Sequence, residues 1–220
     1  MKDEKMSLFF TKVYLWMFIG LLISAGVSYI TSINTTMLAI YAKSYLVIVL
    51  LEFVVVIGLS SAIRKISPSV AKLLYILYSA LNGFTLASIF MIYKLDSIIM
   101  VFLASALLFA ILAIYGYITK ADLTKFGRIL FVGLIAIIIM SLINIFVGGS
   151  RLGIILSILS ILIFLLLTAY DMQKLKRIYY AYENDEFMTD KMSIYGALDL
   201  YLDFINIFIN LLRLFGRRRD

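Results

Sequence analysis

Four acidic residues lie in stretches that are otherwise apolar, and their carboxylates are the groups best suited to chemistry. They are Glu52, Asp171, Asp199 and Asp203. With 0 cysteines and 0 histidines in the chain, thiol nucleophiles, Cys/His zinc sites and Ser–His–Asp triads are excluded. Carboxylates, hydroxyls, amides and backbone carbonyls remain, and these groups suit protons and hard cations. We therefore expect ion handling, no bound cofactor and no enzymatic activity.

The last apolar stretch carries a polar stripe. Asp199, Asp203, Asn206 and Asn210 follow one another at intervals of four, three and four residues, which places them on one face of a helix. A polar face of this kind meets other helices or a water-filled path rather than lipid. The asparagines are equally well explained as hydrogen bonds between helices. Buried carboxylates, by contrast, must be paired or protonated.

Asp171 and Asp203 are predicted to form a pair. They flank the polar turn 183–191 at equal distance, because their midpoint is residue 187. Residues equidistant from a hairpin turn lie at the same depth, provided that the sixth helix continues past Met172 towards Tyr180. Carboxyls in contact share a proton and titrate in coupled steps, as a proton switch, an acid–base pair or a cation site. The alternative is that Asp171 ends its helix at the solvated interface.

Glu52 and Arg64 belong to the second apolar stretch but cannot pair with each other. They are 12 residues apart, which is roughly 18 Å along a helix. Arg64 lies at the cytoplasmic level, where its long side chain has the reach to meet the aspartate pair. The alternative for Arg64 is an ordinary cytoplasmic anchor.

Composition places these residues in a membrane. The 220-residue chain is 64% hydrophobic and only 15% charged, with a mean hydropathy of +1.05. Soluble domains are about 45–50% apolar and about 25% charged. Disordered chains, nucleic-acid-binding modules and disulfide scaffolds are therefore excluded. The net charge of +7 is interpreted as cytoplasmic anchoring, with no nucleic-acid partner.

Seven apolar stretches predict an all-α integral membrane protein with a single transmembrane domain over 1–220. A bilayer needs about 20 apolar residues per helix, and the predicted helices cover 13–33, 45–63, 70–93, 98–118, 129–147, 153–180 and 194–212. The N-terminal segment and the even-numbered loops carry 13 basic residues against 3 in the odd-numbered loops, so the N-terminus is predicted to be cytoplasmic. A seventh crossing puts the arginine-rich tail outside. The last helix is therefore either re-entrant or crosses despite that tail.

The C-terminal run 197–213, ALDLYLDFINIFINLLR, resembles the signature of the Bax inhibitor family, also called the transmembrane Bax inhibitor motif family. It is most similar to the bacterial YetJ-like branch. Segments 170–173 (YDMQ) and 82–86 (NGFTL) agree with this resemblance. The resemblance implies seven transmembrane helices, the last one central and surrounded by the other six, in a bacterial inner membrane.

The resemblance also implies a function. Members of this family are described as pH-sensitive calcium leak channels, with calcium and protons as the ligands and lipid as the surroundings. The paired aspartates of the family correspond to Asp171 and Asp203, which are also the candidate calcium ligands. The latch arginine corresponds to Arg64 and an acidic residue of the second helix to Glu52, whereas Asp199 departs from the usual pattern. The predicted ion pathway comprises Glu52, Asp199, Asn206 and Asn210.

Two other functions stay open on the sequence. One is a membrane regulatory protein that binds a protease or an assembly partner, whose binding site the sequence does not reveal. The other is an intramembrane aspartyl protease, which also uses two aspartates on helices. The Gly-x-Gly-Asp motif expected of such a protease is absent, and Gly196 and Asp199 are spaced wrongly for it.

Overall fold

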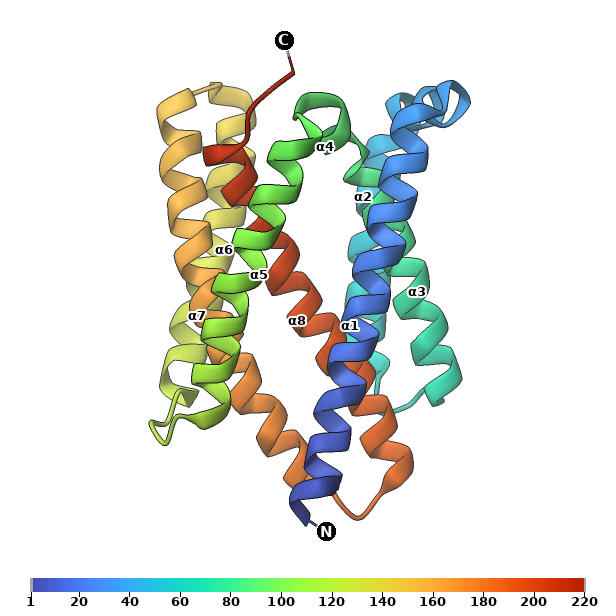
Figure 1. Cartoon of the computed structure of the whole chain (residues 1–220), viewed down its shortest axis with the longest axis vertical. Helices are drawn as coiled ribbons and strands as arrows, with labels where there is room; N and C mark the ends of the chain where they lie inside the picture. Colours follow the sequence, from blue (N-terminus) through green and yellow to red (C-terminus); the bar gives the residue numbers. More distant parts are fainter. Residues whose placement is uncertain (1, 220) are drawn as a thin grey trace. The chain divides into compact units, whose positions relative to one another are not determined.

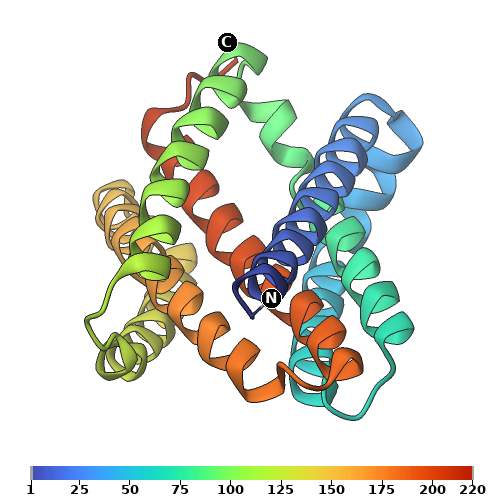
Figure 2. The ribbon, with the colours of Figure 1, turned by 60° about the horizontal axis from the view of Figure 1, so that its bottom comes forward.

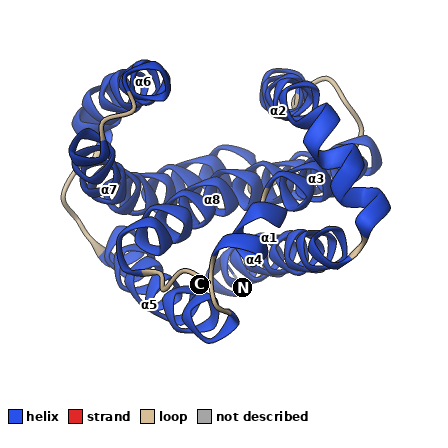
Figure 3. Ribbon diagram, turned by 90° about the horizontal axis from the view of Figure 1, so that it is seen from above, coloured by secondary structure: helices blue, strands red, loops and turns tan. Residues whose placement is uncertain are grey.

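The computed structural model describes residues 2–219. Its helices can be followed along the chain in Figure 1 and, from another side, in Figure 2. In chain order they are α1 (Lys2–Ile33), α2 (Thr35–Ala62), α3 (Pro68–Thr85), α4 (Ala87–Ile92), α5 (Leu95–Ile118), α6 (Thr124–Val147), α7 (Ser150–Tyr182) and α8 (Glu186–Phe215). Figure 3 shows helices and connecting loops, with no strand in this part of the chain. The predicted all-α fold is confirmed.

Six segments of the described chain are long and apolar enough to cross a membrane. They are Glu4–Ile33, Thr35–Ala62, Pro68–Ile92, Leu95–Ile118, Thr124–Asn144 and Ser150–Tyr182. Only 6% of the most apolar window of α2 is buried, so its side chains are left to face lipid. Because apolar side chains exposed over whole helices require a lipid solvent, the chain is an integral membrane protein.

Local signals define where two helices begin. Asn34 and Ser67 have extended backbones, and each side chain accepts a hydrogen bond from the backbone N–H three residues later. Pro68 then occupies the first helical position of α3, where its missing N–H costs nothing. These caps start the helices at the ends of the apolar stretches.

The predicted third span, about 70–93, corresponds to one candidate span, Pro68–Ile92, whose helix is interrupted at Leu86. There α3 ends and α4 begins, and the Leu86 N–H donates to the Asn82 carbonyl oxygen at 2.9 Å. The Thr85 hydroxyl lies 2.9 Å from the same carbonyl oxygen. Hydroxyl competition for backbone acceptors bends membrane helices. The interruption therefore places polar groups within the span.

The predicted last helix, about 194–212, lies within a longer helix, and the predicted turn, 183–191, is shorter than expected. α7 continues to Tyr182 and α8 begins at Glu186, so the turn is residues 183–185. Asp185 caps α8, since its Oδ1 accepts the Met188 N–H at 3.0 Å. The equal spacing of the two aspartates does not hold about this shorter turn. Their pairing stays a prediction that needs other support.

The chain divides into two compact units. The first unit contains Met1–Tyr93, Ile178–Tyr201 and Arg219–Asp220, and the second contains Lys94–Arg177 and Leu202–Arg218. Helices α7 and α8 each contribute residues to both units. The predicted single transmembrane domain stays a prediction.

Each unit contains a close approach between two helices. In the first unit, a Cβ atom added to Gly83 would lie 2.6 Å from the Ser24 carbonyl oxygen, so α1 and α3 meet backbone to backbone. In the second unit, a Cβ on Gly116 would clash with the Ala169 carbonyl oxygen, between α5 and α7. Small residues at such crossings are the usual way for membrane helices to pack.

Helix α8 is too polar to count among the six apolar spans, yet it is buried along most of its length. Ile194, Leu198 and Leu200 are fully buried in the first unit, and Ile207 and Leu212 are almost fully buried in the second. A helix that is surrounded by protein can carry polar residues that lipid would not accept. This burial explains how the polar stripe is tolerated.

The two ends of α8 are tied to the two ends of the interrupted third span. Near its start, Lys191 Nζ donates to the Arg64 carbonyl oxygen, before α3, at 3.0 Å. Beyond its end, the Arg219 N–H donates to the Ile92 carbonyl oxygen, at the end of α4, at 2.8 Å. A helix of 30 residues is about 45 Å long, which exceeds a bilayer core of about 30 Å. The last helix is therefore long enough to cross, and the choice between crossing and re-entry stays a prediction.

The basic tail is held by the α4–α5 connection rather than by solvent alone. In the second unit, the Lys94 N–H donates to the Arg217 carbonyl oxygen, and the Arg217 N–H donates to Ser97 Oγ, both at 2.9 Å. The Arg217 guanidinium also pairs with Asp96. These contacts hold the tail at this end of α8 whichever side of the membrane it faces.

The chain is expected to place its two termini on opposite sides of the membrane. Because it contains 0 cysteines, the single variants Lys5→Cys, Lys65→Cys and Arg218→Cys introduce unique thiols. A membrane-impermeant maleimide added to intact cells should label Arg218→Cys and not the other two, which should react only after permeabilisation. Labelling of Lys5→Cys and Arg218→Cys from the same side would mean that α8 does not cross.

Candidate functional site

Among the described residues, two acidic side chains are buried, those of Asp171 and Asp203. Asp171 lies on α7 and is 8% exposed, and Asp203 lies on α8 and is 3% exposed. Both belong to the second compact unit. Their predicted proton-sharing contact stays a prediction, but both carboxyls are inside the protein, which argues against a solvated Asp171 at a helix end.

Asp171 is partly compensated by its own helix. Lys174 Nζ donates to Asp171 Oδ1 at 3.0 Å, one helical turn further along α7. The lysine side chain is 26% exposed and the aspartate side chain is 11% exposed. A long lysine stem of this kind can lie along the protein while its ammonium stays near water. One positive charge is therefore held beside a carboxylate that water barely reaches.

The remaining residues of the predicted stripe are divided between the units. Asp199 is half-buried and lies in the first unit, whereas Asn206 and Asn210 lie in the second with Asp203. Each asparagine Nδ2 donates to the backbone carbonyl oxygen four residues earlier, at 2.8 Å. One of the two amide hydrogens of each asparagine is thus used within α8.

The other side of α8 in the second unit is aromatic. Phe204 and Phe208 pack edge-on against Phe102 of α5, with ring centres 5.1 and 5.8 Å apart. Phe204 also meets Phe109 at 5.8 Å. Aromatic packing of this kind fixes the rotation of a helix about its axis. It keeps α8 in one orientation in this unit.

Glu52 lies in the first unit at the interruption between α3 and α4. The Thr85 hydroxyl donates to Glu52 Oε1 at 2.8 Å, and Asn82 Nδ2 donates to Glu52 Oε2 at 3.4 Å. Both donors suit an ionised carboxylate, which only accepts hydrogen bonds. The sequence analysis did not identify Asn82 or Thr85 as partners. In the sequence, Asn82 and Thr85 are distinguished only as polar residues within a mostly apolar stretch.

Arg64, the predicted latch, lies in the connection after α2 and is exposed. Its backbone, rather than its side chain, is fixed in the first unit, because its carbonyl oxygen accepts the Lys191 ammonium. Lys191 is 2% exposed and lies over the Phe187 ring at 4.9 Å. The exposed side chain of Arg64 thus extends from a turn whose backbone is held by Lys191. Its latch role stays a prediction.

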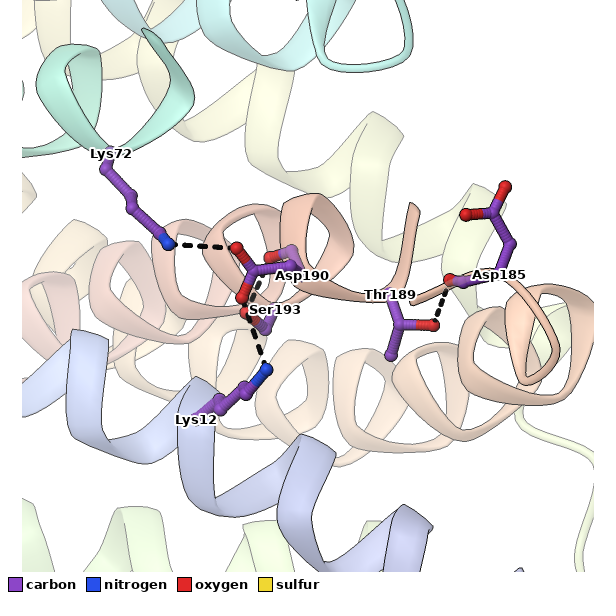
Figure 4. Close-up of polar contacts among 6 residues, drawn as sticks. All are labelled: Lys12, Lys72, Asp185, Thr189, Asp190 and Ser193. Atoms are coloured by element: carbon purple, nitrogen blue, oxygen red, sulfur yellow. Dashed lines mark hydrogen bonds and ion pairs between the residues drawn. The ribbon is translucent and has the colours of Figure 1, made fainter. Parts of the chain in front are cut away.

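Asp190, near the start of α8, links this helix to α1 and α3. It was not among the candidate site residues predicted from the sequence. Figure 4 shows the Lys72 ammonium of α3 and the Lys12 ammonium of α1 directed at the Asp190 carboxylate, with N–O distances of 2.9 and 3.3 Å. Burial raises the pKa of Asp190, but the hydrogen bonds and charges of Lys72 and Lys12 outweigh this and hold the pKa below its ordinary value. The carboxylate therefore stabilises the fold while it is ionised.

Asp190→Asn is expected to lower the melting temperature by about 2–4 °C, for a loss of about 1 kcal/mol in a partly exposed ion pair. Since the pKa is lowered on folding, the stabilisation is complete above the ordinary aspartate pKa of about 3.9 and is lost as the pH falls through the lower folded value. Thermal unfolding in detergent, at neutral and at strongly acid pH, measures this. Asp185→Asn removes a nearby charge but keeps a good helix cap, so it should change little. Equal effects of both variants would exclude a specific role for Asp190.

Residues 6–220 match the family described as "Inhibitor of apoptosis-promoting Bax1". The chain is 45% identical to an uncharacterized protein of Borreliella burgdorferi, over 96% of this chain and 93% of that protein. It is 40% identical to "Inner membrane protein YbhL" of Escherichia coli K12, over 96% and 92%. It is 38% identical to an uncharacterized membrane protein of Streptococcus pyogenes serotype M1, over 98% and 95%.

Proposed function

The chain belongs to the Bax inhibitor family, and on that premise we propose that it is a pH-sensitive calcium leak channel gated by Asp171 and Asp203. Because a relative carries the name of an inner membrane protein, we also propose a bacterial inner membrane with the N-terminus in the cytoplasm. Calcium and protons are then its ligands, with no cofactor and no catalytic step.

The burial of two carboxyls inside one compact unit carries this proposal. Asp171 and Asp203 are each less than a tenth exposed, and both lie in the second unit. Charged residues inside a membrane cost roughly 2.5–3.5 kcal/mol each, so they are retained for a function. In this proposal the two groups share a proton, and loss of that proton leaves two like charges that repel. The repulsion is the proposed gating force.

The proposed path for calcium is built from scattered oxygen atoms. In the described chain, no group of three or more acidic residues, histidines or cysteines is placed to hold a metal ion. Calcium binds tightly when several carboxylates surround it. Conduction, by contrast, requires sites that bind the ion weakly enough for it to leave. Glu52, Asp199, Asn206 and Asn210 therefore serve as weak sites along the path, and Asp171 and Asp203 serve as the gate.

Arg64 is the proposed latch of this gate, and Arg64→Ala should move the midpoint of the flux-versus-pH curve upward by roughly half a pH unit. A guanidinium stabilises the form of the pair that carries two negative charges, so the gate changes state at lower pH when Arg64 is present. Arg64→Lys keeps the charge but loses the bidentate geometry and should shift the curve less. An unchanged or lowered midpoint in Arg64→Ala would reduce Arg64 to a membrane anchor.

Calcium uptake into liposomes that contain only the purified protein tests the proposed function. An indicator dye inside the vesicles reports the rate, with the external pH varied from mildly acidic to mildly alkaline. We expect uptake above that of protein-free vesicles, with a rate that depends on pH. Uptake no faster than in protein-free vesicles at every pH would contradict the proposal, and cleavage of an added membrane peptide would support a protease instead.

A further inference from the structure

A hydrogen-bonded chain continues from Glu52 through the first unit to α8. Asn82 Oδ1 accepts the Tyr201 hydroxyl at 2.8 Å, on the side of the amide away from Glu52. The Tyr201 hydroxyl also lies 2.6 Å from Ser24 Oγ of α1. Tyr201 is 0% exposed and Ser24 is 2% exposed. Side chains of α1, α2, α3 and α8 are thereby joined through one buried polar cluster.

One assignment of donors and acceptors satisfies all the hydrogen bonds that join Glu52, Asn82 and Tyr201 in this cluster. Ionised Glu52 only accepts, so the Asn82 atom that faces it must be the Nδ2 donor. Asn82 Oδ1 then faces Tyr201 and needs a hydrogen from the tyrosine hydroxyl. The Ser24 hydroxyl has a single hydrogen to donate. Three possible acceptors lie near its oxygen: the Tyr201 oxygen at 2.6 Å, the Gly20 carbonyl oxygen at 2.9 Å and the Ser79 carbonyl oxygen at 2.7 Å. The orientation of the Asn82 amide is thus tied to Tyr201.

We propose that Tyr201 is a positioning residue for Glu52: its hydroxyl fixes the Asn82 amide so that Nδ2 points at the carboxylate. This inference rests on the proposed function for its effect on calcium, because Glu52 is placed there in the ion path. Without the hydroxyl, Asn82 Oδ1 loses its donor inside the protein, and a flipped amide presents an oxygen to an ionised carboxylate. Glu52 then loses a donor and meets a repulsive dipole.

Tyr201 is well suited to a test that removes only its hydroxyl. Its ring packs edge-on against the rings of Tyr75 and Tyr78, with centres 6.2 and 5.9 Å away, so phenylalanine keeps these contacts. Tyr75 supplies a matched control. It is equally buried, at 0% exposed, and its hydroxyl donates to the Trp16 carbonyl oxygen at 2.9 Å rather than to Asn82. Tyr75→Phe therefore removes a comparable buried hydrogen bond.

The first readout is the calcium dependence of flux in protein-only liposomes. In Tyr201→Phe the calcium concentration that gives half-maximal flux should change by about fivefold, as expected for one lost hydrogen bond to a charged group. The flux-versus-pH midpoint should stay where it is in the wild type, because the aspartates are untouched. Tyr75→Phe should leave both quantities unchanged. Equal calcium dependence in wild type and Tyr201→Phe would overturn the inference.

The second readout does not depend on calcium transport. Subtracting the infrared spectrum of Glu52→Gln from that of the wild type isolates the carboxylate band of Glu52. Tyr201→Phe should shift this band and Tyr75→Phe should not. A band that does not move in Tyr201→Phe, or that moves equally in both variants, overturns the positioning role. Failure of wild-type flux alone contradicts the proposed function, whereas the infrared comparison decides the role of Tyr201 in either case.

Discussion

Replacing Asp171 and Asp203 together by asparagine should abolish the pH dependence of calcium flux and leave a folded protein. Asparagine keeps the size and polarity of aspartate but has no proton to gain or lose, so the repulsion between two ionised carboxylates disappears. Both side chains are buried, and neutral amides cost less than charges there. Liposome flux measured over a pH series, with a melting curve for the variant, checks both parts.

Asp122→Asn is the matched control for this double variant. Asp122 lies in the same unit but is exposed, in the α5–α6 connection, where its Oδ1 accepts the Thr124 N–H at 2.9 Å. Asparagine can keep that hydrogen bond, so its flux-versus-pH curve should match the wild type. A double variant that titrates like the wild type would remove the aspartates as the pH sensor. A flat curve in Asp122→Asn as well would point to a general electrostatic effect.

Glu52→Gln should reduce calcium flux by about tenfold, which corresponds to about 1.4 kcal/mol, and should change the pH response much less. Glu52 is the acidic side chain at the interruption of the third span, where Thr85 and Asn82 donate to it. Glutamine keeps the shape but removes the negative charge that attracts a cation. The sensor aspartates remain, so a pH dependence should persist in the residual flux.

Glu52→Asp separates charge from geometry in this test. It keeps the carboxylate but shortens the side chain, so it should retain more flux than Glu52→Gln even if hydrogen bonds to Asn82 and Thr85 weaken. Unchanged flux in Glu52→Gln would leave Glu52 with a structural role. Loss of the pH response with full flux would assign Glu52 to the sensor rather than to the path.

Much of the fold was predictable because lipid imposes simple rules on sequence. Long apolar stretches separated by basic loops predicted an all-α membrane protein, and the family was predicted from the run 197–213. The interruption at Leu86 was not predicted, because isolated polar residues in segment 70–93 do not by themselves indicate a break in a helix. It occurs where Asn82 and Thr85 turn towards Glu52, 30 and 33 residues earlier in the chain.

The polar contacts between distant helices were the least predictable part of the candidate site. Asp190 was taken as part of a polar turn, yet it lies within α8 and meets Lys12 and Lys72, 178 and 118 residues away. Nothing in the local sequence distinguishes such an aspartate from a solvated one. Burial of Asp171 and Asp203 was expected from their apolar surroundings, whereas the turn used to align them proved shorter. The local pattern thus identified four candidate carboxylates, of which Asp171 and Asp203 are buried and Glu52 and Asp199 are half-buried, whereas tertiary structure determines their partners.

A reversible pH jump on liposomes containing only this protein tests the central proposal most directly. Calcium uptake is followed while the vesicles are moved from mildly acidic to mildly alkaline buffer and back again. A proton-gated leak predicts that the rate changes at the first step and returns to its starting value at the second. A rate that never exceeds that of protein-free vesicles, or that does not respond to either step, would contradict the proposal that this chain is a pH-sensitive calcium leak.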